Sequence, residues 1–158
     1  MVQEDLIKDF CARLQDKNIL IKDLCARLPY DTMIHGIYAY QNLDFDTESD
    51  YIEYKEMDNV LTVSDIEWIQ MCAAEVKPYL FPLSSMTEEQ KNECFNGTPL
   101  GIDKYGDVAV KDDFFGNSLY TDLEIYLEVI DWLLKNHFDI YGLIDKNLAI
   151  DATNLNIY

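Results

Sequence analysis

Residues 20–40 read Leu-Ile-Lys-Asp-Leu-Cys-Ala-Arg-Leu-Pro-Tyr-Asp-Thr-Met-Ile-His-Gly-Ile-Tyr-Ala-Tyr, and this stretch decides the class of fold. Its first half places apolar side chains three and four residues apart, which is the spacing of a helix with one buried face. Pro29 ends that helix, because the residue before a proline is pushed out of the α region. From Thr32 the apolar residues alternate instead, as they do in a half-buried strand. A helix that leads directly into a strand predicts an α+β fold.

The helical half of this stretch occurs twice in the chain. Residues 6–14 and 20–28 differ only at Phe10 and Leu24, and 14 residues separate the two copies. Because 14 residues are two heptads, the copies stay in phase along one straight helix, whereas a break near Asp16 would let them pack face to face as a helix pair. Both arrangements fit the sequence. We interpret the repeat as a tandem duplication and expect the fold to tolerate deletion of residues 1–18.

Beyond residue 40 the pattern predicts an antiparallel meander of short strands. The expected elements are a polar loop at 44–50, strands at 51–55 and 60–63 joined by a turn at 56–59, a hairpin at 101–111, and an edge strand at 148–150. Ser64, Thr87 and Thr121 each stand three residues before Glu or Gln, which is the spacing of a capping box and predicts a helix start. The helix after Ser64 is expected to run to about Glu75.

The third capping box is expected to open the longest helix, residues 122–136, which has apolar side chains on nearly two faces. That pattern is typical of an element covered by both a sheet and neighbouring helices. We predict that Trp132 is largely buried on this helix, with Tyr126 and Leu133 facing the sheet. The predicted fold is therefore α+β, with an N-terminal helix or helix pair, an antiparallel meander of short strands and a long central C-terminal helix, in a single domain spanning 1–158.

The composition predicts a self-sufficient globular protein. With 158 residues, 49% of them apolar, the chain can bury roughly two thirds of its unfolded surface. No basic leader and no long apolar run occur, so we expect a soluble, cytoplasmic protein that does not enter membranes. The four cysteines, Cys11, Cys25, Cys72 and Cys94, lack the C-x-x-C spacing of metal or redox sites, and we interpret them as reduced thiols of the core.

The formal net charge is −18, and its distribution indicates a class of partner. Residues 1–30 hold five acids and five bases, so the other 128 residues carry 25 acids against 7 bases. Such a field repels nucleic acid and anionic lipid and attracts basic proteins, with a reach of about 8 Å at physiological salt. We therefore predict a basic protein partner and no direct binding to nucleic acid. The predicted partner surface is the acidic loop with Asp44, Asp46, Glu48 and Asp50.

No catalytic residue, cofactor site or metal site is predicted. The two histidines, His35 and His137, have no motif around them, and we interpret both as structural. Residues 44–55 invite comparison with a calcium-binding EF-hand loop, but Ser49 stands where the turn needs glycine and Lys55 where a bidentate glutamate is needed. The six glycines are too scattered to form a phosphate-binding loop.

Three blocks of sequence carry a resemblance to a known family. They are residues 21–30 (IKDLCARLPY), residues 76–90 (VKPYLFPLSSMTEEQ) and residues 130–139 (IDWLLKNHFD), the last continuing in 142–144, 148–152 and 154–158. In these blocks the chain resembles small uncharacterised acidic proteins encoded in phages and prophages of anaerobic gut bacteria. It departs from them in carrying two copies of the D-L-C-A-R-L block and in having Asp31 where relatives commonly have glycine. The resemblance implies an origin and no mechanism.

Two hypotheses of function follow. The first is an accessory protein of a phage or mobile element that is not an enzyme and binds a host or phage protein through an acidic surface; nucleic-acid mimicry is one version of it. The alternative is an enzyme that depends on carboxylates and a divalent metal. Three or more carboxylates clustered in a pocket would favour the enzyme, and acids spread over a convex face would favour the binding protein. A third reading of the acidity is that it serves only solubility.

Overall fold

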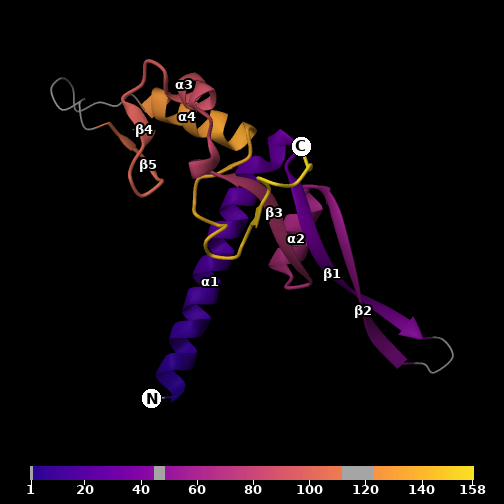
Figure 1. The fold of residues 1–158 in the computed structure, drawn as a ribbon. Coiled ribbons are helices and arrows are strands. Elements are labelled where there is room, and N and C mark those ends of the chain that lie inside the picture. Colours follow the sequence, from indigo (N-terminus) through magenta and orange to yellow (C-terminus); the bar gives the residue numbers. More distant parts are fainter. Residues whose placement is uncertain (1, 45–48, 112–122) are drawn as a thin grey trace.

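A computed structural model describes residues 2–44, 49–111 and 123–158 (Figure 1). Helices and strands are mixed along the chain, which confirms the α+β class. In chain order the described residues form α1 (Val2–Arg27), β1 (Met33–Asp44), β2 (Ser49–Val60), α2 (Val63–Gln70), β3 (Ala74–Pro82), α3 (Glu88–Phe95), β4 (Leu100–Ile102), β5 (Val108–Val110), α4 (Leu123–Lys135), β6 (Phe138–Asp139) and β7 (Ile150–Asp151). Short 3-10 turns at Leu28–Tyr30 and Leu83–Ser85 follow α1 and β3.

The main sheet has the strand order β2-β1-β3-β6, with β7 also paired to β3. β1 and β2 are antiparallel over their full length of 12 residues each. β3 pairs antiparallel with β1 only through its first half, up to Pro78 opposite Ile34, and its second half pairs in parallel with β7 and β6. A proline cannot donate to a ladder, so Pro78 sits at the point where β3 changes partners. β4 and β5 form a separate hairpin, as the sequence predicts.

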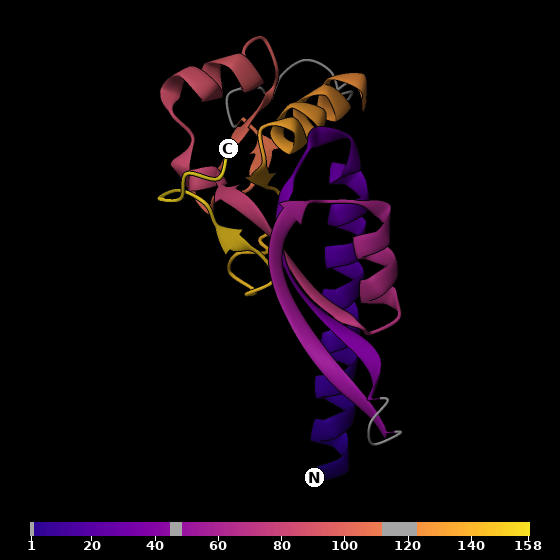
Figure 2. The ribbon, with the colours of Figure 1, turned by 90° about the vertical axis from the view of Figure 1, so that its right-hand side faces the viewer.

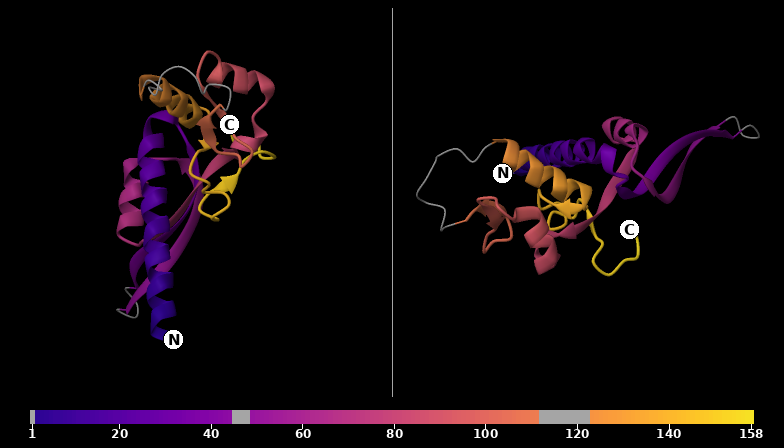
Figure 3. Two further views of the ribbon diagram at one scale, coloured as in Figure 1. Left: turned by 90° about the vertical axis from the view of Figure 1, so that its left-hand side faces the viewer. Right: turned by 90° about the horizontal axis from the view of Figure 1, so that it is seen from above.

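α1 and α2 cover one face of the sheet, and the main core lies beneath them (Figure 2, Figure 3). Leu24 of α1 and Ile34 of β1 are completely buried there. The other buried side chains of this core are Leu20, Tyr38, Leu61, Ile66, Ile69, Val76, Leu80, Leu143 and Ala149. A second apolar cluster joins α3, α4 and β4 around Leu83, Met86, Cys94, Phe95, Leu100, Val129, Leu133 and Phe138.

α1 is one continuous helix, which decides between the two arrangements that the repeat allows. Its second copy packs on the sheet, with Leu20 and Leu24 buried, whereas Leu14 of the first copy is exposed. The N-terminal half of α1 runs past the body of the molecule in Figures 1 and 2. The same nine-residue motif is therefore core in one copy, while residues 12–14 of the other face solvent.

Two of the predictions for residues 51–75 are wrong, one for a turn between strands and one for the end of a helix. Residues 56–59 are not a turn: β2 runs through them to Val60, in unbroken register with β1. The helix predicted up to Glu75 ends at Gln70, and β3 begins at Ala74. The reason is tertiary, because β3 gains strand partners on three distant segments that no local pattern indicates.

The predicted long central helix is also only partly correct. α4 has 13 residues and is shorter than α1, with 26. Leu133 is completely buried as predicted, but Tyr126 is exposed and Trp132 is half-buried, with its Nε1 donating to Glu93 Oε1 at 3.3 Å. Leu123, Tyr126 and Leu127 at its N-terminal end all face solvent. Thr121 lies outside the described residues.

Of the other two predicted capping boxes, the one before α3 is confirmed and the one before α2 starts at a different residue. Thr87 Oγ1 accepts from Gln90 N at 3.2 Å and Gln90 Oε1 accepts from Thr87 N at 2.9 Å, which confirms the box before α3. The box of α2 starts two residues before Ser64: Asp65 Oδ2 accepts from both the backbone N and Oγ1 of Thr62, each at 2.7 Å.

The interpretation of all four cysteines as core thiols is wrong. Cys94 is buried, and burial raises the pKa of its thiol to about 12, but Cys25 and Cys72 are exposed. The side chain of Cys11 lies outside the described part of the chain.

Candidate protein-binding surface

The β1–β2 hairpin continues beyond the body of the sheet. Pairing between β1 and β3 ends at Tyr38, so residues 39–44 and 49–54 form a two-stranded ribbon, here called the hairpin arm. The arm projects from the molecule in Figure 1 and in the right-hand view of Figure 3. Its base is held by a bond from Ala39 N to Ala73 O at 2.8 Å and by packing of Tyr40 against Trp68. A two-stranded ribbon without further contacts is only marginally stable in water, so contacts with another molecule would stabilise the arm.

One face of the hairpin is apolar and exposed. Ile34 and Tyr38 point into the core. Because side chains alternate along a strand, the odd-numbered residues of β1 point to the opposite side, here called the outer face. The register with β1 places the even-numbered residues of β2 on this face as well. Its exposed apolar side chains are Ile37, Ile52, Tyr54 and Val60. Tyr54, at 69% exposure, is the most exposed of the four.

Carboxylates surround these apolar side chains. Residues 41–60 contain seven acids and a single base, Lys55. Asp50 Oδ2 accepts from Gln41 Nε2 at 3.0 Å, and Glu53 Oε2 accepts from Asn42 Nδ2 at 3.0 Å. Both donors are neutral amides, which orient the carboxylates without cancelling their charge, although Glu53 Oε2 also lies 4.0 Å from Lys55 Nζ. The arm therefore presents ordered negative charge that a cationic partner can pair with.

His35 joins β1 to the acids of β2 on the outer face. Its Nε2 lies 3.0 Å from Glu56 Oε1 and its Nδ1 lies 2.8 Å from Asp58 Oδ1. Asp58 Oδ1 also accepts from the hydroxyl of Tyr79 at 2.9 Å. The hydrogen bonds from His35 and Tyr79 lower the pKa of Asp58, so this carboxyl is ionised at neutral pH. His35 bonds within the fold, in accord with a structural role.

The structure places the predicted partner residues at the end of this arm, as far as they are described. Asp44 is the last residue of β1, and Asp50 is an exposed residue of β2. Asp46 and Glu48 lie outside the described residues. The sequence analysis missed the apolar outer face, because the turn it placed at 56–59 divided β2. The alternation of Ile52 and Tyr54 with polar residues was the available signal.

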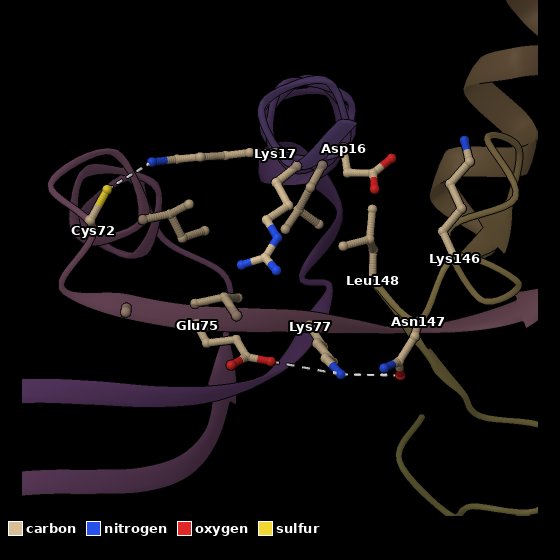
Figure 4. A pocket seen from close by; sticks show the side chains of 13 residues that line it. Asp16, Lys17, Cys72, Glu75, Lys77, Lys146, Asn147 and Leu148 are labelled. Atoms are coloured by element: carbon tan, nitrogen blue, oxygen red, sulfur yellow. Dashed lines mark hydrogen bonds and ion pairs between the residues drawn. The ribbon is translucent and has the colours of Figure 1, made fainter. Parts of the chain in front are cut away.

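A pocket of about 750 Å³ lies between α1, the end of α2, β3 and residues 146–148 (Figure 4). Its walls combine aliphatic side chains, Leu20, Ile69, Val76 and Leu148 among them, with six charged ones. Lys17 reaches across to donate to Cys72 Sγ at 3.2 Å, and Lys77 donates to Asn147 Oδ1 at 3.1 Å while lying 3.7 Å from Glu75. Both lysines are thus bonded to groups of the pocket wall and brace it.

Charged groups are also buried beneath α1. Asp23 and Arg27 are completely buried, and Arg27 Nε donates to Asp23 Oδ2 at 2.7 Å. Burial raises the pKa of Asp23, and the Arg27 guanidinium opposes that shift. Asp139 accepts from the backbone N of Leu143 and of Ile144, each at 2.9 Å. These bonds connect α1, β6 and the segment after β6, which is a structural role.

His137 lies beside this group and stacks on Tyr158 with a centroid distance of 3.9 Å. Burial and the nearby Arg27 charge lower its pKa to about 4, so the imidazole is neutral at pH 7. Its Nδ1 is 3.3 Å from Thr32 Oγ1. Tyr158 in turn donates to Tyr79 O at 2.7 Å and accepts from Met33 N at 3.2 Å. These contacts fit the structural role expected for His137.

Within residues 2–44, 49–111 and 123–158, no three or more His, Cys, Asp or Glu side chains come close enough together to hold a metal ion. No helix in the same ranges has the length and apolar character needed to cross a bilayer. Comparison with family models, with curated proteins and with solved structures found no match to this chain. The resemblance to proteins of phages and prophages therefore stays a prediction.

Proposed function

We propose that this chain is a binding protein without enzymatic activity, which captures a basic protein partner through the acidic β1–β2 hairpin. The observation that carries the proposal is the combination of oriented carboxylates, in a stretch with a single base, with exposed apolar side chains on a projecting arm. An origin in a phage or mobile element belongs to the proposal on the strength of the three sequence blocks alone.

The two kinds of side chain would contribute differently to binding. Exposed carboxylates attract a basic partner over about 8 Å at physiological salt and raise the association rate more than the affinity. Burial of Ile52 and Tyr54 would supply affinity, at about 25 cal/mol for each Å² of apolar surface removed from water. Tyrosine is also a frequent hot-spot residue of interfaces. We therefore expect Tyr54 to lie near the centre of the contact.

The apolar side chains also bear on the other hypotheses. A protein that mimics only the charge of nucleic acid needs carboxylates and no apolar residues between them, so the outer face favours a partner that brings apolar side chains of its own. The metal-dependent enzyme has no supporting carboxylate cluster among the described residues.

The proposal is tested by comparing two variants of equal charge in a pull-down from bacterial lysate. The arm variant combines Asp44→Asn, Asp50→Asn and Glu53→Gln. The control variant combines Glu89→Gln, Glu128→Gln and Asp145→Asn, which are exposed acids on other elements. We expect one basic protein to be retained by the parent and the control, and to be lost with the arm variant and at high salt. Retention that does not depend on the arm charges would overturn the proposal.

A further inference from the structure

We propose that the free edge of β2 takes up an extended basic segment of the partner as an added antiparallel strand. This inference rests on the proposed function and specifies how the partner is held. Strand addition is a common mode of peptide recognition, in which main-chain hydrogen bonds give affinity and side chains give specificity.

β2 has one strand neighbour, β1, and stands at the end of the sheet order. All nine residues 50–58 are exposed, so nothing in the described part of the chain covers this edge. A strand of 12 residues is about 40 Å long, which is more than most strands reach and unusual for an edge.

The hydrogen bonds of β1 show which backbone groups of β2 point outward. Ala39 N bonds to Ala73 O, on the β3 side, so Ala39 does not bond to its β2 partner Tyr54. At the other end, Leu61 N bonds to Thr32 O, so the pair of Leu61 and Thr32 is a bonded one. Bonded and non-bonded pairs alternate along an antiparallel ladder, so the odd-numbered residues of β2 bond to β1 and the even-numbered ones do not. Both observations lead to the same alternation. The N–H and C=O groups of residues 50, 52, 54, 56 and 58 point to the free edge.

β2 lacks most of the devices that keep natural edge strands from pairing. Such edges are usually short, interrupted by a bulge, or protected by proline and several lysines. β2 contains no proline, its register with β1 has no interruption over 12 pairs, and Lys55 is its only lysine. The edge is therefore open to a strand of suitable charge.

Charge selects a basic segment over a second copy of the chain. β2 carries four acids and one base. In an antiparallel β2–β2 pair centred on Tyr54, Asp50 would face Asp58 of the other copy twice, against two Glu53–Lys55 pairs. A pair centred on Glu53, the next register that keeps the even residues opposite one another, would set Asp50 opposite Glu56 and Glu53 opposite itself. Like charges directly opposite one another destabilise a strand pair. A lysine- or arginine-containing strand removes this conflict.

The order of side chains on the outer face defines the segment further. From residue 58 to residue 50 the even positions read acid, acid, apolar, apolar, acid. An antiparallel strand that complements them has a basic residue at positions 1, 3 and 9 and apolar residues at positions 5 and 7. The probe is therefore the peptide Lys-Thr-Lys-Thr-Ile-Thr-Ile-Thr-Lys with both ends blocked. A control peptide has the same sequence with N-methylated backbone amides at positions 3, 5 and 7, so that it keeps the charge and the side chains but loses donors that would face β2.

Hydrogen exchange of the full chain, followed by NMR with and without the probe peptide, tests the geometry directly. We expect the amides of Ile52, Tyr54 and Glu56 to gain at least tenfold protection. The amides of Glu53 and Lys55, already bonded to β1, should change by less than threefold. A gain that does not alternate along β2 would overturn strand addition.

A matched pair of variants tests the same point by affinity. Ile52→Pro removes one outward N–H without touching the β1 ladder, and Ile52→Val keeps that N–H in a side chain of similar size. We expect the first to weaken binding of the probe at least tenfold and the second by less than threefold, with thermal unfolding showing that both variants fold. Equal binding of the probe and the N-methylated control, lost on charge neutralisation of the arm, would overturn strand addition while leaving the proposed function intact. Absence of any peptide binding would also overturn strand addition, whereas the pull-down decides the proposed function separately.

Discussion

Arg27 Nη2 donates a hydrogen bond of 2.6 Å to the carbonyl oxygen of Phe138, and both side chains are buried. The bond joins the end of α1 to β6, across 111 residues of sequence. Because the same guanidinium also pairs with Asp23, one side chain holds two parts of the fold together and compensates a buried carboxylate.

The repeat supplies a matched control for this role, since Arg13 occupies the position of Arg27 in the exposed copy. We expect Arg27→Met to lower the free energy of unfolding by about 3–5 kcal/mol, because it leaves Asp23 buried without its partner. Arg13 is exposed, where a charged contact contributes at most about 1 kcal/mol, so Arg13→Met should cost clearly less than Arg27→Met. Urea unfolding of both variants measures the difference. Equal effects would mean that the Asp23–Arg27 pair does not stabilise the fold.

Deletion of residues 1–18 should leave a protein that still unfolds cooperatively. Residues 12–15 are exposed, and from residue 12 onward the first buried residue of α1 is Leu20. Deletion of residues 1–24 removes Leu20 and Leu24 from the main core and should abolish the transition. Thermal unfolding followed by circular dichroism distinguishes the two. If the shorter deletion also abolishes the transition, the first copy is part of the folding unit.

Two leucines on α4 should differ strongly in their effect on stability. Leu133 is completely buried in the second apolar cluster, whereas Leu127 is 56% exposed. We expect Leu133→Ala to cost about 2–5 kcal/mol and Leu127→Ala less than about 0.5 kcal/mol in the free energy of unfolding. Chemical denaturation measures both. A large loss from Leu127→Ala would show that the N-terminal end of α4 is covered in solution.

The neutral state of His137 should make stability depend on pH. Its pKa is about 4 in the folded chain, against 6.5 for a histidine in water. The unfolded chain therefore binds a proton first as the pH falls, so the stabilisation is complete above pH 6.5 and is lost between pH 6.5 and 4. His137 has a φ of 61°, which asparagine tolerates, so His137→Asn removes the titrating group without straining the backbone.

We expect His137→Asn to be less stable than the parent at pH 7, because it loses the stacking on Tyr158. Its melting temperature should fall less steeply than that of the parent between pH 7 and pH 5. His35→Gln is the control, since His35 lies at the surface between two carboxylates. A slope unchanged by His137→Asn would contradict the proposed burial of a neutral imidazole.

The local features of this fold could be predicted from the sequence, and the long-range ones could not. The change from helix to strand at Pro29, the capping box at Thr87 and the β4–β5 hairpin each depend on a few neighbouring residues. The strand character of residues 74–82 depends instead on partners up to 71 residues away, as between Tyr79 and Ile150. Asp58 and Asn59 resemble turn residues, yet they belong to β2, where His35 and Tyr79 bind the Asp58 carboxylate.

The candidate site likewise has one part that could be predicted from the sequence and one that could not. The charge of the arm is a property of composition, and Asp44 and Asp50 could be named from the sequence. Which face of the hairpin stays uncovered depends on where α1 and α2 pack, because those helices bury Ile34 and Tyr38 and leave Ile37 and Tyr54 outside. That choice is made by the whole fold and is absent from the local pattern.

The 14-residue duplication in α1 has a consequence for how this gene can change. Fourteen residues advance an α-helix by about 21 Å and leave it only about 40° short of four full turns. Gain or loss of one unit therefore lengthens or shortens the protruding end while Leu20, Leu24 and Arg27 keep their orientation toward the sheet. An insertion of 12 or 13 residues would instead rotate everything before it by a larger angle. The repeat lets the length of the helix vary in whole steps during evolution without any compensating change in the core.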